Sequence, residues 1–419
     1  MPVAPRTPRP WLPALVLVTG VGPLATDTYL ASLPQVQRSL GTSATVVQLT
    51  MTFFIAGMAL GQLFSGPVSD GRGRRSMIVA GAATFTLMSL VCAVAPTGWT
   101  LVGARAVQGL VAGMGVSVGR AVVSDRYDGP RAAAMFGTLA SFSLIGPVVA
   151  PGIGGALLSV GDWRTIFVFL AALGVLMTVL ALVGIPETLP PSMRHAGGVR
   201  SVLARMKELA ADRVFVAPVA VQCLVVAGFF VYIGGSSIVL QSQLGVSPGQ
   251  YSVLFASNAV GMVLASLAFR FLVVRVGAVV LRTVSMAVTA TAGFALLVVC
   301  LLAPEHTPPL PLVWAPLALM LVGLGMFLPS STVITQTAGR RLAGTAAALG
   351  GGVPFLVGSL TTPLTGLLGS QTVLTMSAST ACFYAVALVV ARRTRRLLPD
   401  DRPRPAPVEA DRELVGSAA

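Results

Sequence analysis

Long apolar runs, separated only by short stretches of glycine, proline and charge, occupy most of this chain. Of its 419 residues, 55% are hydrophobic and only 10% are charged, and the mean hydropathy is +0.85. A soluble domain carries about 25% charged residues. This composition excludes an ordinary cytosolic enzyme, a disordered regulator and a disulfide scaffold. It favours an all-α integral membrane protein, because lipid offers exposed backbone groups no hydrogen-bond partner.

The number and length of the apolar runs predict twelve transmembrane helices, since a span of about 20 residues crosses the bilayer core. The first run follows Arg6 and Arg9, as a signal peptide would, but it is too long for one and contains Asp27, so we expect an uncleaved span. The expected spans are 12–33, 46–66, 76–95, 99–120, 132–158, 164–185, 214–240, 250–272, 279–301, 312–334, 343–368 and 371–391.

The basic residues are distributed unevenly over the two sides of these spans. Twelve spans place both termini on one side, and every lysine and arginine except Arg38, Arg105 and Arg164 falls there. This positive-inside signature predicts a multi-pass protein of the cell (plasma) membrane with both termini in the cytoplasm. It accounts for the net charge of +14 without a nucleic-acid partner. The basic cluster 392–396 either touches anionic lipid or only orients the last span.

Two polar segments divide the chain. We expect an N-terminal six-helix bundle at 1–185, a cytoplasmic central loop at 186–213 and a C-terminal six-helix bundle at 214–391. The central loop ends in a short amphipathic stretch that predicts a surface helix. The last segment, 392–419, is rich in proline and charge and predicts a disordered cytoplasmic tail.

An internal repeat supports the two-bundle organisation. Shifting the chain by 212 residues places related glycines and prolines on one another, and the shared pattern G-x4-P-x2-G falls in the fifth and the eleventh span. Two related six-helix halves match transporters in which repeats face each other across a central binding site. The superimposed pairs are Gly113 with Gly325, Gly146 with Gly358, Pro151 with Pro363 and Gly154 with Gly366.

Asp27 is the one acidic residue that falls within a span rather than in a loop, at a span end or in the tail. Inserting a carboxylate there costs on the order of 3 kcal/mol, and such groups mark functional sites. We therefore expect Asp27 to face a wet cavity and to bind and release a proton. The alternative is that it lies at the outer interface, held by Arg38 or by helix caps.

Arg105 is the only basic residue well inside a span, and Gln108 shares its helix face. Arg105 either clamps neighbouring backbone carbonyls or adjusts the proton affinity of Asp27 and exchanges partners during proton transfer. The sequence leaves both roles open.

The residues Asp70 to Arg75 are expected to form a tight turn between the second and third spans, because glycine permits positive φ. Arg74 is expected to bridge to Asp70 or to Asp125 as a latch on the cytoplasmic face; the arginines of this turn could instead only fix topology. The fifth span is rich in glycine and proline, which predicts a bent, closely packed helix.

Other chemistry finds little support. The four cysteines stand singly in apolar runs, and the two histidines lie in expected loops. We therefore expect no disulfide, metal site or cofactor. The sequence holds no HExxH motif, buried histidine or serine/histidine/aspartate set, so an enzyme is not expected. These cysteines and histidines are Cys92, Cys223, Cys300, Cys382, His195 and His306.

Several motifs carry a family resemblance. VQLTMTFFIAGMALGQLFSGPVSDGRGRR (47–75) contains most of a loop motif G-x-x-x-D-R-x-G-R-R, with Gly71 and Arg72 as departures, and DTYLASLP (27–34) resembles DMYLPALP. Arg105 to Gly109 and the glycines of 137–155 match motifs of the fourth and fifth spans, with Ala150 in place of a glycine; WRTIF (163–167) and PETLP (186–190) fit as well. Together these motifs resemble the major facilitator superfamily and, within it, the Bcr/CflA branch of drug:proton antiporters.

This resemblance implies the major facilitator fold and a monomeric, proton-coupled antiporter that exports small, mostly apolar drugs of phenicol or bicyclomycin type by alternating access. The alternative is an importer or uniporter of a small metabolite on the same fold. It implies proton coupling at Asp27 and Arg105. It implies a cytoplasmic gate motif at Gly66, Asp70, Gly73, Arg74, Arg75 and Asp125, and an antiporter motif at Gly137, Gly146, Pro151, Gly154 and Gly155. Candidate cavity residues, which could instead only join helices by hydrogen bonds, are Tyr29, Gln108, Tyr232, Asn258 and Gln336.

Overall fold

The computed structural model describes residues 10–127, 129–189, 199–369 and 371–397, and these ranges contain helices and no strand. The first group of helices comprises α1 (Leu12–Leu30), α2 (Leu33–Ser39), α3 (Ala44–Arg72), α4 (Arg74–Ala93), α5 (Gly98–Arg126), α6 (Gly129–Val160) and α7 (Trp163–Gly184). After α8 (Val199–Ala210), the second group comprises α9 (Arg213–Gln243), α10 (Pro248–Val276), α11 (Ala278–Leu302), α12 (Leu310–Ala338), α13 (Ala343–Thr361), α14 (Leu364–Leu367) and α15 (Val373–Thr394).

Ten of the twelve predicted spans coincide with one helix each; the first, 12–33, covers α1 and reaches α2, and the eleventh, 343–368, covers α13 and α14. Within the described residues, 10 helices are long and apolar enough to cross a membrane, and there are 11 if α1 and α2, which are bent by 64° to each other, are counted together as one span. The remaining predicted span, 132–158, corresponds to α6, whose apolar stretch Ile145–Val160 is shorter. The all-α membrane architecture expected from the apolar runs is therefore confirmed.

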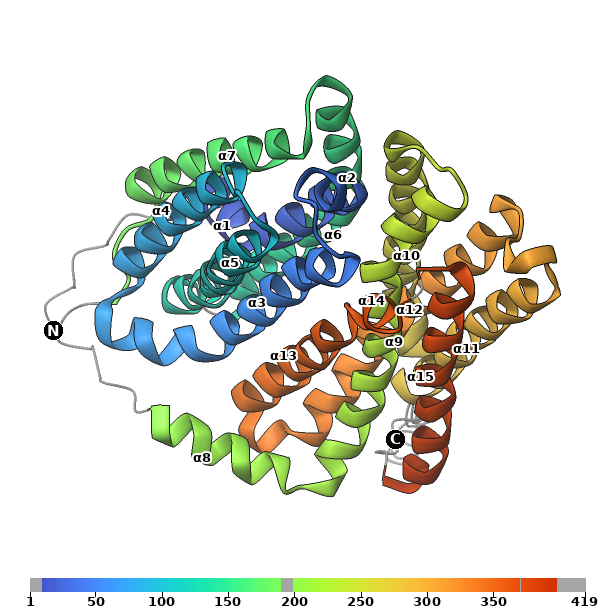
Figure 1. The fold of residues 1–419 in the computed structure, drawn as a ribbon. Coiled ribbons are helices and arrows are strands. Elements are labelled where there is room, and N and C mark those ends of the chain that lie inside the picture. The colour runs from blue at the N-terminus through green and yellow to red at the C-terminus, as the bar shows by residue number, and fades with distance from the viewer. Residues whose placement is uncertain (1–9, 128, 190–198, 370, 398–419) are drawn as a thin grey trace, which may run out of the picture.

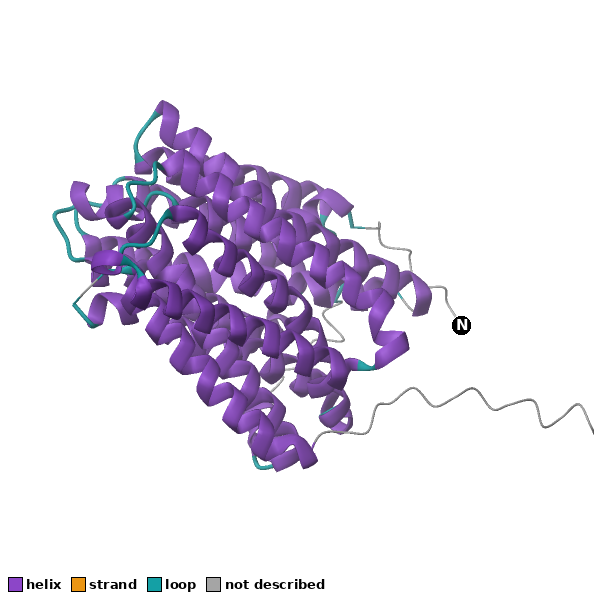
Figure 2. Cartoon of the chain, turned by 90° about the vertical axis from the view of Figure 1, so that its right-hand side faces the viewer, coloured by secondary structure: helices purple, strands orange, loops and turns teal. Residues whose placement is uncertain are grey.

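The helices form two groups that lie side by side (Figure 1). Helices α1 to α7 pack mainly on one another, as do α9 to α15, and the main contacts between the groups are α3 with α13 and α6 with α10. The long helices run between two ends of the molecule (Figure 2). We call the end with the α3–α4, α5–α6 and α10–α11 links the basic end, because Arg72, Arg126 and Arg275 lie there, and the opposite end the Arg-poor end.

Polar N-caps fix where many of the helices begin at the Arg-poor end. Ser43 accepts a hydrogen bond from the backbone of α3, and Thr97 does the same for α5. Ser247 forms a capping box with Gln250 at α10, and Thr372 forms one with Thr375 at α15. These side chains satisfy backbone N–H groups that have no partner within their helix.

The expected turn over Asp70 to Arg75 is wrong in its extent. Helix α3 continues to Arg72 and α4 begins at Arg74, so Gly73 alone joins them, with φ 94° and ψ 150°. Gly277 joins α10 to α11 in the same way, with φ 81° and ψ 157°. A side chain is strained at such positive φ, which explains the glycine at both links.

The segments outside the two groups differ in part from expectation. The amphipathic stretch of the central loop forms α8, as predicted, and Leu209 of α8 packs with Phe215 and Ala346. The expected disordered tail from residue 392 is wrong for its first residues, because α15 extends to Thr394 and a 3₁₀ turn covers Arg395–Leu397. Residues 398–419 lie outside the described part of the chain.

The repeat seen in the sequence recurs in the packing. Gly113 of α5 lies against the backbone carbonyl of Met58 in α3, and Gly325 of α12 lies against the carbonyl of Met262 in α10. In both places a Cβ atom would collide with that carbonyl oxygen, so only glycine permits the approach. The second and fourth long helices of each group are therefore joined by the same contact.

Candidate functional site

A cavity of about 210 Å³ lies between the two groups of helices. Its wall is mostly methionine, phenylalanine, leucine and isoleucine, and Asp27 is the only ionisable side chain among the described lining residues. Both groups contribute, through α1, α3 and α6 and through α9, α10, α12 and α13. The lining residues are Pro23, Thr26, Asp27, Met51, Ile55, Met58, Pro147, Phe229, Phe230, Ile233, Phe255, Ala259, Met262, Leu321, Leu328 and Phe355.

Asp27 is half-buried in this wall. Thr26 donates a hydrogen bond to the Oδ1 atom of Asp27 at 3.1 Å. Among the described residues, Asp27 forms no salt bridge. The interface alternative for Asp27, with Arg38 as its partner, finds no support here, because Arg38 donates to the carbonyl of Pro34. A carboxyl group with no cationic partner, beside apolar walls, can accept a proton or interact directly with a ligand.

Arg105 is completely buried beside the helix that carries Asp27. Its Nη1 atom donates to the Ala25 carbonyl at 3.2 Å and to Gln108 Oε1 at 2.8 Å. Its guanidinium carbon lies 3.9 Å from the ring centre of Phe54 and 5.0 Å from that of Tyr29. In this conformation Arg105 therefore clamps a backbone carbonyl of α1 and does not pair with the carboxylate of Asp27.

The residues expected to line the cavity are packed behind its wall or away from it. Tyr29 is buried and shares a hydrogen bond with Thr50. Gln108 donates to Ser89, and Asn258 donates to the hydroxyl of Tyr232 at 3.3 Å. None of the five expected cavity residues is among the described lining residues; these are Tyr29, Gln108, Tyr232, Asn258 and Gln336. Tyr232 is nonetheless close to the site, because its ring stacks on Phe255, with centroids 6.2 Å apart.

Sequence reasoning missed the apolar wall itself. Phe229, Phe230, Phe255 and Phe355 form much of it, and nothing separates these residues from the many other apolar side chains of the spans. Met58 and Met262, the methionines that Gly113 and Gly325 contact, both line the cavity, but the 212-residue shift does not superimpose them, so the repeat gave no signal for them.

The residues of the expected gate motif meet at the basic end. Arg74 Nη1 lies 2.7 Å from Asp70 Oδ1, and Arg74 Nε lies 3.1 Å from Asp125 Oδ2. The backbone N–H of Arg74 donates to Glu187 Oε1 at 2.9 Å. Arg74 thus joins α3, α4, α5 and the segment after α7, all within the first group of helices, whereas the expectation had Arg74 pairing with only one of the two carboxylates.

The remaining members of that motif have smaller roles. Arg75 donates to the carbonyl of Leu182 at 2.7 Å, Gly73 forms the link already described, and Gly66 has open space where a Cβ atom would lie.

The glycines of α6 pack this helix against both groups. Gly154 lies against the carbonyl of Thr28 in α1, and Gly146 lies against Pro23. Gly155, the next residue after Gly154, faces Ser252 of α10. Pro151 is buried inside α6, and Gly137 has open space where a Cβ atom would lie. The motif therefore brings α6 close to the Asp27 helix on one side and to the second group on the other.

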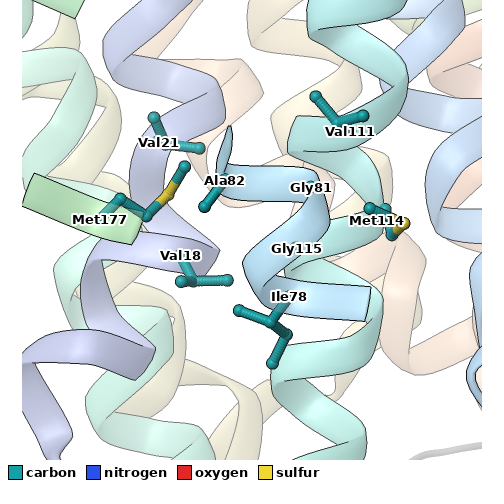
Figure 3. A pocket seen from close by; sticks show the side chains of 9 residues that line it. All are labelled: Val18, Val21, Ile78, Gly81, Ala82, Val111, Met114, Gly115 and Met177. Atoms are coloured by element: carbon teal, nitrogen blue, oxygen red, sulfur yellow. The ribbon is translucent and has the colours of Figure 1, made fainter. Parts of the chain in front are cut away.

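Other places in the described chain offer less chemistry. A void of about 10 Å³ among α1, α4, α5 and α7 is lined only by apolar groups such as Val18, Ile78 and Met177, and is too small for a ligand (Figure 3). Among the described residues, no group of three or more histidine, cysteine, aspartate or glutamate side chains could hold a metal ion. The four cysteines are free.

Comparison with known proteins gives consistent similarities. A model of the Major Facilitator Superfamily matches residues 15–362. The uncharacterized MFS-type transporter YdgK of Bacillus subtilis (strain 168) is 34% identical over 350 residues, which are 83% of this chain and 86% of YdgK. The multidrug resistance protein MdtL of Vibrio parahaemolyticus serotype O3:K6 (strain RIMD 2210633) is 32% identical over 246 residues, 59% of this chain, and the match spans only 61% of MdtL.

Solved structures resemble the fold at low sequence identity. A bacterial homologue of the human lysosomal transporter Spinster, inward-facing and unoccupied, has a TM-score of 0.68 at 17% identity, covering 94% of this chain and 98% of its own. The xylose transporter XylE from E. coli, partially occluded and inward open, has a TM-score of 0.67 at 16% identity, covering 93% of this chain and 100% of its own. At these identities the likeness concerns the fold alone.

Proposed function

The chain belongs to the Major Facilitator Superfamily, and from that premise we propose that it is a proton-coupled antiporter of the Bcr/CflA type that exports small, mostly apolar drugs by alternating access. The observation that carries the proposal is the position of Asp27. Among the described residues that line the cavity it is the one carboxyl group, in a mostly apolar wall to which both groups of helices contribute.

The wall supports the substrate class. A ligand that leaves water for methionine, phenylalanine and leucine side chains gains free energy in proportion to the apolar surface it buries. The cavity offers few polar groups that could form hydrogen bonds with a strongly polar metabolite, so the free-energy cost of removing such a ligand from water would not be offset. The similarity to MdtL, a multidrug resistance protein, agrees with a drug of phenicol or bicyclomycin type.

Asp27 supports the coupling. A carboxylate that faces the binding cavity becomes neutral when it takes up a proton, so its charge and its hydration differ between the loaded and the empty state. Moving one charge through 100 mV is worth about 2.3 kcal/mol, which sustains roughly a fifty-fold gradient of drug. We assign Arg105 to holding the Asp27 helix in place, through the carbonyl of Ala25.

The proposal includes a sidedness. The positive-inside rule places the basic end in the cytoplasm of a plasma-membrane protein, with both termini there. In this assignment the contacts of α3 with α13 and of α6 with α10 separate the cavity from the outer side, and 1–185 and 214–391 act as two rocking bundles joined by the segment 186–213.

Transport into everted membrane vesicles tests this function. Vesicles holding the protein should accumulate chloramphenicol or bicyclomycin when a proton gradient, acidic inside, is imposed, and the accumulation should stop when the gradient is collapsed. Asp27→Asn should abolish gradient-driven uptake. Asp162→Asn is the matched control, because Asp162 caps α7 at the Arg-poor end and asparagine caps equally well.

Two results would reject the proposal. Uptake that persists without a proton gradient favours the importer or uniporter alternative, and full gradient-driven uptake by Asp27→Asn removes Asp27 from the coupling. A resistance profile of cells that express the chain, with phenicols and bicyclomycin among the drugs, then identifies the substrate.

A further inference from the structure

Gln48 of α3 joins the two groups of helices at the Arg-poor end. This side chain is completely buried. Its Nε2 atom donates to the Gly234 carbonyl at 3.1 Å and to Thr365 Oγ1 at 2.9 Å, and Gln371 Oε1, at 3.4 Å, shares one of these two hydrogens. Its Oε1 atom accepts from the backbone N–H of Gly366 at 3.1 Å. All four partners belong to the second group of helices.

A break in a helix supplies one of these partners. Helix α13 ends at Thr361, and Pro363 caps the short helix α14, to which Gly366 belongs. The first N–H groups of a helix have no partner within it, so the N–H of Gly366 needs an acceptor from elsewhere. A Cβ atom on Gly366 would lie 2.8 Å from Thr45 Oγ1, so glycine at this position permits the close approach of α3.

Gln241 makes the reverse connection, from the second group to the first. Its Nε2 atom donates to the Ala31 carbonyl at 3.0 Å and to Ser237 Oγ at 2.9 Å. Ala31 lies in the break between α1 and α2, where the chain bends by 64°. A carbonyl at a helix end also lacks an intrahelical partner. Each group thus presents a broken helix whose free backbone group is satisfied by a glutamine of the other group.

At the other main contact between the groups, that of α6 with α10, the side chains that the structure describes form no such bond. There Gly155 of α6 packs on Ser252 of α10, and Ser252 donates to the Pro248 carbonyl of its own helix at 2.9 Å. Helix α6 also runs unbroken through Pro151, whereas the corresponding Pro363 interrupts the second half. The repeat alone therefore does not produce the glutamine contacts.

We propose that Gln48 and Gln241 form a reciprocal latch that holds the Arg-poor end closed, and that both must release before that end can open during the transport cycle. Each glutamine is paired when the end is closed and can be hydrated when it is open. Replacing the amide leaves buried backbone groups without partners only in the closed form, so the closed form alone is destabilised.

Distance measurements between spin labels test the latch without any drug or proton gradient, and hence independently of the proposed function. The four native cysteines are replaced by alanine and the protein is placed in lipid nanodiscs. One label pair, on the exposed residues Ser159 and Glu305, reports on the Arg-poor end. A second pair, on exposed Ser124 and Arg340, reports on the basic end.

Gln48→Leu and Gln241→Leu should each raise the ratio of open to closed molecules at the Arg-poor end by about ten-fold or more, since 1.4 kcal/mol corresponds to ten-fold. The basic-end distance should shorten in the same molecules. Gln243→Leu is the matched control, because Gln243 accepts from the backbone of Val373 within the second group. Its distances should match those of the unmodified protein.

Gly366→Ala disturbs the contact of Gln48 by changing its partner in the second group of helices. The added methyl group would collide with Gln48 and Thr45, so this variant should open the Arg-poor end as Gln48→Leu does. Gly351→Ala, in open space on α13, should leave the distances unchanged. Unchanged distances in both Gln48→Leu and Gly366→Ala, or an equal opening in Gln243→Leu, would overturn the latch.

Discussion

Arg105 binds the backbone of the helix that carries Asp27, through a 3.2 Å hydrogen bond from Nη1 to the carbonyl of Ala25, and not the carboxylate itself. Of the two roles that the sequence left open for Arg105, this conformation favours the clamp. The carboxyl group of Asp27 therefore takes no part in the contact that holds α1.

This relationship makes the planar guanidinium of arginine important at position 105. Arg105→Lys keeps the charge but loses the stacking of a flat group on the ring of Phe54, and with it the placement of the Nη1 atom that donates to both Ala25 and Gln108. We expect a loss of about 1.5–3 kcal/mol of stability and a lower rate of drug export. Thermal unfolding in detergent and vesicle transport measure the two effects.

Arg164→Lys provides the control for that substitution. Arg164 also lies over an aromatic ring, 4.2 Å from the centre of Trp163, but it is partly exposed at the Arg-poor end. Its replacement should change both quantities little. An Arg105→Lys protein with unchanged stability and transport would contradict the clamp.

The matched glycine contacts predict that replacing the glycine by alanine destabilises both groups of helices in the same way. Gly113→Ala and Gly325→Ala each place a methyl group against a carbonyl, that of Met58 or that of Met262. The helices must move apart, at a cost of about 1–3 kcal/mol, and the methionines of the cavity wall move with them. Both variants should melt earlier and bind drug more weakly in direct binding measurements.

Gly103→Ala separates this collision from any general effect of alanine in a helix. Gly103 lies on α5, as Gly113 does, but has nothing within 4 Å of an added Cβ atom. Because alanine favours helix over glycine, we expect an unchanged or slightly raised melting temperature. If Gly113→Ala behaved as Gly103→Ala does, the close packing of α5 on α3 would be wrong.

The arginine network at the basic end predicts a difference between two neighbouring residues. Arg74→Ala removes a buried guanidinium from two carboxylates that are themselves partly exposed, those of Asp70 and Asp125, and should cost about 1–2 kcal/mol. Arg75→Ala removes one bond from an exposed side chain to a carbonyl and should cost less than about 1 kcal/mol. Chemical unfolding of each variant in detergent ranks them, and equal losses would contradict the network.

The sequence predicted those features that show as a difference between apolar and charged residues along the chain. Twelve runs stood out against their charged links, and Asp27 stood out as a lone acid inside a run; the structure places helices at the former and the cavity wall at the latter. Polar side chains inside spans were poorer guides. Tyr29 and Gln108 are bonded to Thr50 and Ser89 behind the wall, because a buried polar group needs a partner wherever it lies.

The sequence could not show which helix faces pack against one another and which face lipid. The phenylalanines of the wall resemble those that face lipid, and the role of Gln48 depends on a helix break in the distant segment around Pro363. The extent of α3 was missed for a related reason. Asp70 and Arg72 are polar, so they read as loop, yet they continue the helix until Gly73 ends it.

Filling the cavity tests whether its volume determines the substrate. Ala259 of α10 lines the cavity and is 3% exposed, so Ala259→Phe should occupy much of the 210 Å³ and reduce export at least ten-fold, most strongly for the larger of two drugs. Val260→Phe changes the next residue, which is 41% exposed and not among the described lining residues, and should leave export intact. Both proteins should reach the membrane in equal amounts, since neither substitution introduces a polar group into a span. Vesicle uptake of chloramphenicol and of a bulkier apolar drug measures the difference. If the two variants transported equally well, the drug would bind elsewhere and the cavity at Asp27 would serve the proton alone.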